Sequence, residues 1–205
     1  MYLYPKWIRI WHVLNALLFI ILIVTGLSMQ YTDMENDSYT VGFAKAVSWH
    51  NAAAMILTAS YVIFILGNLF TGNGKYYRLR KENFWQDIIK QTRYYAFGIF
   101  KGEKHPFPVT MERKFNPLQK FTYILAMYLG MPLLIISGFV LLFPEISIKN
   151  FFGISGLVVN DLLHISTGFL LSIFMVVHIY TCTLGAKPSS LFWGMITGYH
   201  RSDEH

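Results

Sequence analysis

The chain has 205 residues, of which 54% are hydrophobic and only 14% are charged, and its mean hydropathy is +0.41. An ordinary globular chain carries roughly a quarter charged residues, so this composition excludes a typical soluble enzyme. An aromatic content of 17% and a single cysteine also exclude disordered, collagen-like and disulfide-stapled chains. We therefore expect a single all-α domain, residues 1–205, that is an integral membrane protein.

Four stretches are apolar enough to cross a bilayer, which takes about 20 residues per helix. These predicted spans are residues 8–29, 48–70, 118–143 and 161–184. The third contains Pro132, which a membrane helix tolerates when neighbouring groups satisfy the freed carbonyl. Asp161 is expected to cap the start of the fourth span. The sequence thus predicts a bundle of four transmembrane helices.

The basic residues are distributed unevenly around these spans. Fifteen of the 17 fall on the side of the N-terminus, and only Lys45 and Lys149 fall on the opposite side. The opposite loops instead carry acidic residues, namely Asp33, Glu35, Asp37, Glu145 and Asp161. By the positive-inside rule, both termini, the loop 71–117 and the tail 185–205 are predicted to be cytoplasmic. The net charge of +6 is therefore a topology signal, and it predicts no nucleic-acid partner.

The cytoplasmic loop contains a pattern typical of an amphipathic helix. Over residues 83–100, Phe84, Trp85 and Ile88 alternate with basic residues such as Lys90 and Arg93. A helix of this kind lies on a membrane surface with its apolar face among the lipids. We expect the same of residues 191–196 in the tail.

Four of the seven histidines, His12, His50, His164 and His178, fall inside the spans, where ionisable side chains are rare and usually functional. His12 lies early in a span that enters from the cytoplasm, whereas His50 and His164 lie near the outer ends of theirs. His178 follows His164 by 14 residues, which places it about 21 Å deeper on nearly the same helix face. The depths therefore pair His12 with His178 in the inner leaflet and His50 with His164 in the outer one.

Two stacked pairs of histidines in a helical bundle predict two b-type haems, each held by imidazoles from facing helices. Zinc or copper would want further ligands, and no Asp, Glu or Cys lies at these depths. The single cysteine, Cys182, also excludes a CxxCH haem attachment site and an iron–sulfur cluster. Three alternatives remain: a histidine proton relay in a transporter or channel, a haem-free anchor subunit, and a stand-alone ferric or ascorbate reductase with the same two haems.

Other residues near these depths have two interpretations each. Arg9 lies one turn before His12, so it could pair with a propionate of the inner haem or extend to the membrane interface. Glycines in the spans could admit a porphyrin or could serve close helix packing. These glycines are Gly26, Gly67, Gly138 and Gly168.

Several segments together follow a known pattern, which we list in chain order. They are Arg9-x-x-His12-x-x-Asn15, Thr25-Gly26, His50, Lys114-Phe115-Asn116-Pro117-Leu118-Gln119-Lys120, His164 and His178. On these residues the chain resembles the di-haem cytochrome b subunits of membrane-bound nickel–iron hydrogenases, the gamma subunits of formate dehydrogenases and thiosulfate-reductase-type cytochromes b. The resemblance extends over essentially the whole chain.

The resemblance implies that the four histidines ligate two haems in the pairing given above. It also implies a quinone site, for menaquinone or ubiquinone, beside the inner haem, and by position this site includes Asn116, Gln119 and Lys120. The chain has no site for substrate oxidation of its own. The resemblance implies that this chemistry lies in partner subunits: an iron–sulfur or multihaem cytochrome c subunit and a molybdenum or nickel–iron catalytic subunit, in a bacterial or archaeal cytoplasmic membrane.

Overall fold

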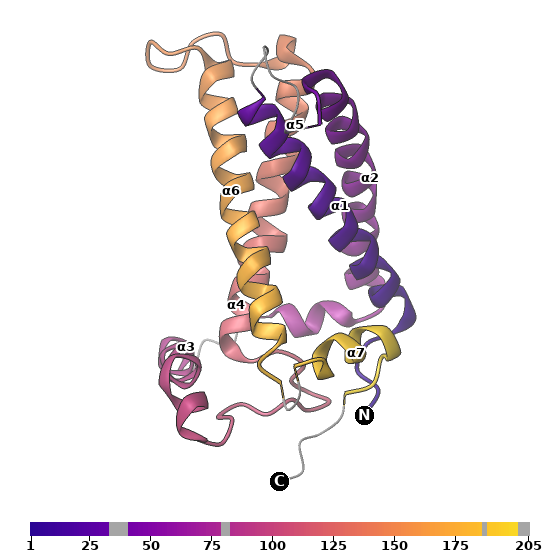
Figure 1. Ribbon diagram of the computed structural model, residues 1–205, viewed down its shortest axis with the longest axis vertical. Helices are drawn as coiled ribbons and strands as arrows, with labels where there is room; N and C mark the ends of the chain where they lie inside the picture. Colours follow the sequence, from indigo (N-terminus) through magenta and orange to yellow (C-terminus); the bar gives the residue numbers. More distant parts are fainter. Residues whose placement is uncertain (33–40, 79–82, 186–187, 201–205) are drawn as a thin grey trace. The chain divides into compact units, whose positions relative to one another are not determined.

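The computed structural model describes residues 1–32, 41–78, 83–185 and 188–200 (Figure 1). Within these ranges every regular element is helical, apart from two isolated β-bridges, so the expected all-α class is confirmed. The helices are α1 (Lys6–Tyr31), α2 (Phe43–Phe70), α3 (Phe84–Arg93), α4 (Pro117–Ile124), α5 (Met131–Leu142), α6 (Gly156–Cys182) and α7 (Ser190–Thr197). The acidic residues Asp33, Glu35 and Asp37, used above for topology, lie outside the described residues.

Four helical stretches in the described chain are long and apolar enough to cross a membrane, as expected. They are α1, α2, the segment Pro117–Leu142, and α6. The fourth begins at Gly156, five residues before the predicted start, because the residues preceding Asp161 carry no charge that would hold them out of the helix. The expectation that Asp161 caps this helix is therefore wrong, since Asp161 lies inside it.

The third span is continuous but not uniformly α-helical. Its α4 and α5 segments are joined by a π-helical turn, Leu125–Gly130, directly before Pro132. A proline lacks the backbone N–H and its ring collides with the carbonyl four residues earlier, so an ordinary α-helix would be broken there. The wider π turn opens the backbone at this point and lets the span continue past the proline.

The chain forms two compact units, which we describe separately. The central unit comprises residues 5–66 and 133–175, and the terminal unit comprises residues 1–4, 67–132 and 176–205. In the central unit the corresponding parts of α1, α2, α5 and α6 lie side by side (Figure 1).

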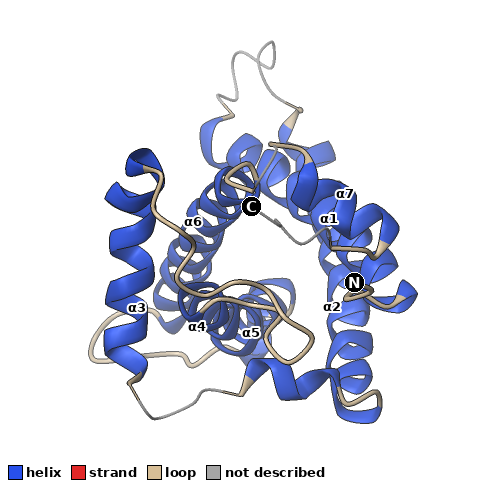
Figure 2. Cartoon of the chain, turned by 90° about the horizontal axis from the view of Figure 1, so that it is seen from below, coloured by secondary structure: helices blue, strands red, loops and turns tan. Residues whose placement is uncertain are grey.

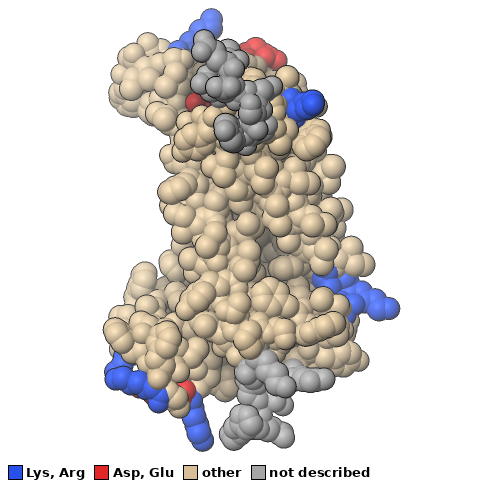
Figure 3. Space-filling model, viewed as in Figure 1, with Lys and Arg blue, Asp and Glu red and all other residues tan. Residues whose placement is uncertain are grey.

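The central unit carries polar side chains inside and apolar side chains outside. Asn15, Thr25 and Ser137 are buried, whereas Ile10 and Phe169 are 70% and 65% exposed. A soluble protein shows the reverse distribution, so these helices are built to face hydrocarbon. On the face that Figure 3 shows, the described Lys, Arg, Asp and Glu side chains lie toward the ends of the span helices, and none covers their middle.

Side-chain hydrogen bonds join α1 to α2 inside the central unit. The Trp11 indole N–H donates to the Ser60 carbonyl at 2.9 Å, and its ring stacks on the fully buried Phe64 with the centroids 4.4 Å apart. The Asn15 amide donates to the Ser60 hydroxyl at 3.4 Å. Polar contacts of this kind hold membrane helices together because lipid offers no hydrophobic drive for their association.

The terminal unit contains the predicted amphipathic helix. Residues 84–101 are helical throughout, as α3 followed by a π-helical turn, Tyr94–Gly98, and a 3₁₀ turn, Ile99–Lys101, so the expected helix is confirmed. The ring of Phe121 in α4 packs against Phe84 and Trp85, with centroids 5.7 and 6.2 Å away. Figure 2 views α4 nearly end-on and α3 lengthwise, so α3 crosses the start of the third span.

The two chain ends meet within the terminal unit. Tyr2 and Tyr199 form an antiparallel bridge, and the Leu3 N–H donates to the Gly198 carbonyl at 2.9 Å. Gly198 has a φ of 86°, a left-handed conformation that suits the glycine ending α7. The tail segment expected to be helical is therefore α7, and its end is held by the N-terminal residues.

Candidate functional site

The central unit brings two of the four span histidines together. His50 comes from the first half of α2 and His164 from the first half of α6, and their ring centroids are 6.3 Å apart with the ring planes inclined by 69°. Each side chain is partly buried between the helices. The sequence separation of these residues is more than a hundred positions, so only helix packing creates this pair.

The separation of the two rings can be compared with that of two imidazoles on one metal ion. An imidazole nitrogen lies about 2.0 Å from a metal that it binds, so the centroids of two rings that share one metal lie roughly 6 Å apart. The observed centroid distance of 6.3 Å is close to this value. The two imidazoles could therefore hold one metal ion between them.

Hydroxyl groups and glycines from neighbouring helices surround this pair. The Thr25 hydroxyl of α1 lies 2.9 Å from Nδ1 of His50, and the Ser137 hydroxyl of α5 lies 2.9 Å from Nδ1 of His164. Gly26 and Gly138 face the same two rings, and a Cβ at these positions would lie 3.7 and 3.3 Å from the nearest imidazole carbon. Helix α6 is held against α5 by the Asn160 amide, which donates to the Ser137 carbonyl at 2.9 Å.

The other two histidines belong to different units. His12 lies in the central unit, three residues after Arg9 and three before Asn15 on α1. Arg9 Nε and Asn15 Oδ1 are both buried, and neither makes a hydrogen bond within the described chain. His178 lies in the terminal unit, where the buried hydroxyl of Tyr123 is 3.2 Å from its Nδ1. The Arg9 Nε–H is a donor that an acidic group of a ligand could accept from, whereas Asn15 Oδ1 can itself only accept.

The start of the third span brings together the residues expected to contact a quinone. Asn116 caps α4: its Oδ1 accepts from the Gln119 N–H at 2.8 Å, and the Gln119 Oε1 accepts from the Asn116 N–H at 3.2 Å. The Lys120 ammonium donates to the Arg78 carbonyl at 3.3 Å. Both amide side chains therefore have a structural task at the helix start.

A polar cluster surrounds this cap. The Asn116 amide donates to the Tyr95 hydroxyl at 2.9 Å, and burial raises the pKa of Tyr95 while this hydrogen bond opposes the rise. Gln91, one turn before Tyr95 in the chain, is fully buried, and its side chain also interacts with the Tyr95 hydroxyl, where it opposes the rise of the Tyr95 pKa. Two buried amide side chains therefore converge on this one hydroxyl.

A buried cation lies beside the same segment. Lys114 is 9% exposed, and its ammonium lies 4.1 Å from the centroid of the Tyr76 ring and 3.5 Å from the Asn73 side-chain oxygen. Burial, and secondarily the nearby Lys75, lower the pKa of Lys114 to about 8.

Sequence reasoning missed most of the residues that contact the histidines and the cap. Ser137, Tyr95, Gln91 and Tyr123 are unremarkable as single positions, because their neighbours come from other helices. One signal was present: a hydroxyl residue followed by glycine recurs within the spans, at Thr25-Gly26, Ser137-Gly138 and Thr167-Gly168.

The fold and the site define a multi-pass membrane protein with paired histidines inside its helical bundle. The chain matches the model of one protein family, prokaryotic cytochrome b561, over residues 3–198. It therefore belongs to this family and is a membrane electron-transfer cytochrome of the haem b type.

Similar proteins agree with this assignment. The protein named cytochrome YdhU of Escherichia coli (strain K12) is 37% identical over 200 residues, which are 98% of this chain and 74% of that protein. Proteins named as B-type cytochrome subunits of Ni/Fe-hydrogenase from Bradyrhizobium diazoefficiens and Cupriavidus necator are 27% and 24% identical. Those matches cover 68% and 67% of this chain but only 57% of each of the two proteins. No solved structure matches the chain. The resemblance to hydrogenase cytochrome b subunits is thus confirmed at the level of the family.

Proposed function

We propose that the chain is the di-haem b subunit of a respiratory oxidoreductase complex in a bacterial or archaeal cytoplasmic membrane. It transfers electrons between a quinone site near the cytoplasmic face and a partner redox subunit on the outer face. The observation that carries the proposal is the His50–His164 pair, whose ring separation of 6.3 Å suits one iron between two imidazoles. His50 and His164 would hold the iron of one haem, which would supply one-electron transfer.

In this proposal each pair of histidines holds one haem. His50 and His164 form the outer site, and His12 and His178 form the inner site. The outer assignment is supported by the ring geometry and the inner one by the depths of the two residues in their spans. Arg9 is assigned to a propionate of the inner haem, which would give its buried and unpartnered Nε an acceptor.

The quinone site is assigned to the start of the third span, with Asn116, Gln119 and Lys120 as its polar groups. Support comes from their place in the same unit as His178 and from the buried polar cluster that Asn116, Tyr95 and Gln91 form beside them. Menaquinone and ubiquinone both present carbonyl oxygens, which accept hydrogen bonds from amide and ammonium groups. The capping hydrogen bonds would hold these groups at a defined angle to the membrane.

The proposal also includes the partner subunits, which are suggested by the names of several relatives. We assign an iron–sulfur or multihaem cytochrome c subunit on the outer face, and beyond it a catalytic subunit of the molybdenum or nickel–iron type. The naming of several relatives as Ni/Fe-hydrogenase subunits supports the nickel–iron form. The membrane lipid completes the surroundings of the four spans.

The experiment that tests this proposal counts haems and assigns them to histidines. Reduced-minus-oxidised visible spectra and pyridine haemochrome assays are recorded on the purified full-length protein and on His12→Ala and His50→Ala variants. We expect about two b haems per chain, with each variant losing a different one. A folded, membrane-inserted protein without haem, or one in which both variants lose the same haem, would refute the ligand assignment. Quinol-dependent haem reduction then tests the quinone site separately.

A further inference from the structure

The two histidines of the outer pair are each met by the same two-residue element from a neighbouring helix. Thr25-Gly26 of α1 faces His50, and Ser137-Gly138 of α5 faces His164. In both cases the hydroxyl oxygen is 2.9 Å from Nδ1, and the following glycine lies beside the imidazole carbon Cε1. The two elements come from different helices and different parts of the chain, so their common geometry is not a local repeat.

The hydrogen bonds determine which nitrogen carries the proton. The Thr25 hydroxyl lies 2.7 Å from the Ile21 carbonyl, and the Ser137 hydroxyl lies 2.6 Å from the Leu133 carbonyl. A hydroxyl has one proton and a carbonyl can only accept, so each hydroxyl donates to the backbone and accepts from the imidazole. Nδ1 of each ring then bears the proton, with the Leu22 carbonyl as a second acceptor near His50 and the Leu134 carbonyl near His164, and Nε2 keeps its lone pair for a metal.

The glycines account for the space next to the rings. An alanine Cβ at residue 138 would lie 3.3 Å from His164 Cε1, closer than side chains normally approach, whereas at residue 26 the corresponding contact of 3.7 Å is ordinary. Gly138 therefore lets the His164 ring approach the Ser137 hydroxyl. At Gly26 a side chain would be tolerated more easily. In the third dipeptide of this type, Thr167-Gly168, a Cβ at the glycine would instead lie 3.8 Å from a methyl carbon of Leu134.

We propose that Thr25-Gly26 and Ser137-Gly138 are the positioning elements of the outer haem site. Their hydroxyls select the Nδ1–H form of His50 and His164, and their glycines make room for the two rings. Because a hydroxyl is a neutral acceptor, both imidazoles remain neutral ligands and gain only moderate basicity from the hydrogen bond. This inference rests on the proposed function, since it assigns His50 and His164 as ligands of one haem.

The test uses the full-length protein with a redox titration and the low-temperature EPR spectrum of each ferric haem. The variants are Thr25→Val and Ser137→Ala, which remove one hydroxyl each, and Thr25→Ser and Ser137→Thr, which retain it. We expect the first two to raise the midpoint potential of the outer haem and to change its EPR signal, because the ligand loses basicity. The inner haem should be unchanged, and the retaining variants should match the wild type.

The matched control is Thr58→Val, which removes a partly buried hydroxyl of α2 that donates to the Ala54 carbonyl at 2.8 Å, two helical turns after His50. It should leave both haems unaltered. A glycine series adds an independent measurement: Gly138→Ala should reduce occupancy of the outer haem more than Gly26→Ala, in keeping with contacts of 3.3 and 3.7 Å.

The outcomes separate this inference from the proposed function. If the hydroxyl-free variants retain the wild-type potential and EPR signal of the outer haem, or shift both haems equally, the positioning role is refuted. If a variant loses the outer haem alone, the role is supported, and if it fails to fold, the retaining variants and the glycine series decide. If His50→Ala and His164→Ala both retain two haems, the ligand assignment itself fails.

Discussion

The capping box at Asn116 allows the energetic contribution of a candidate quinone residue to be measured apart from binding. In Asn116→Ala the helix loses the hydrogen bond to the Gln119 N–H, which costs about 1 kcal/mol, within a range of roughly 0.5–2. The bond to the Tyr95 hydroxyl contributes about 1 kcal/mol more. We therefore expect destabilisation of about 2 kcal/mol, or a Tm about 4–8 °C lower for a chain of this size.

The matched variant is Asn116→Asp. A carboxylate still accepts from the Gln119 N–H and interacts favourably with the helix N-terminus, so its Tm should stay close to that of the wild type. It cannot donate, however, so a quinone carbonyl that relies on the Asn116 amide would lose a hydrogen bond. We expect a raised KM for quinol with little change in Tm.

The assay is thermal unfolding in mild detergent, followed by haem absorbance and by tryptophan fluorescence, together with quinol-dependent haem reduction. The capping argument is refuted if Asn116→Ala unfolds at the wild-type temperature. The binding role is refuted if Asn116→Asp retains the wild-type KM. Because the two variants separate stability from donation, one result does not decide the other.

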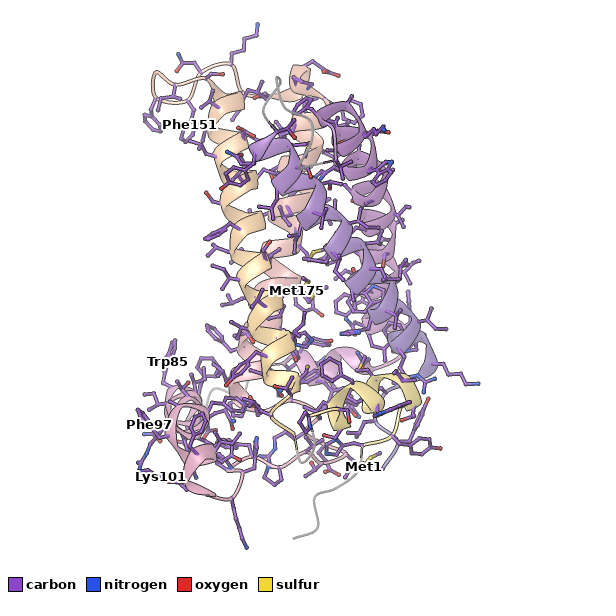
Figure 4. The ribbon with its side chains drawn as sticks, in the orientation of Figure 1. Met1, Trp85, Phe97, Lys101, Phe151 and Met175 are labelled. Carbon is purple, nitrogen blue, oxygen red and sulfur yellow. The ribbon has the colours of Figure 1, made fainter. Side chains whose placement is uncertain are left out.

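Three further predictions concern other parts of the chain. The pKa of Lys114 is lowered from 10.5 to about 8, so above pH 8 the unfolded chain binds more protons than the folded one. The Tm should therefore rise between about pH 8 and pH 10. Lys114→Met should abolish this rise, and a rise that persists in the variant would show that other groups cause it. Gly156→Ala should strongly reduce the yield of folded protein, because its Cβ would lie 1.9 Å from the Ile148 carbonyl oxygen. Gly153→Asn should reduce the yield much less, because the surrounding space is open and asparagine tolerates the left-handed φ of 85° better than most residues. Equal yields would contradict this steric argument. Trp85, 66% exposed and near the upper end of α3 in Figure 4, should be quenched by brominated lipids, and protection from them would exclude an interfacial position for α3.

Much of the architecture could be predicted because it depends on properties local to each helix. A run of about 20 apolar residues predicts a span whatever its neighbours are, since a backbone in hydrocarbon must satisfy its own hydrogen bonds. The same holds for the depths of His12, His50, His164 and His178, which follow from residue counts along helices of fixed rise. The amphipathic helix in the loop was predictable from its pattern for the same reason.

Details that depend on helix ends were less predictable. Asp161 was expected to begin the fourth span, but uncharged residues before it extend α6 to Gly156. The π-helical turn before Pro132 likewise reflects how a local clash is relieved within a packed helix. In each case a short-range preference competes with the packing of the surrounding bundle. The outcome of this competition cannot be predicted from the sequence pattern alone.

The sequence by itself determined the membrane class, the four spans and the set of histidines that the spans contain. Only the tertiary structure decided which hydroxyl faces which imidazole, that the rings of His50 and His164 lie 6.3 Å apart, and that Asn116 caps a helix. The physical reason is that depth is set by rise along one helix, whereas contact requires the relative rotation and spacing of two. Those quantities arise from side-chain packing between helices, which involves residues far apart in the chain.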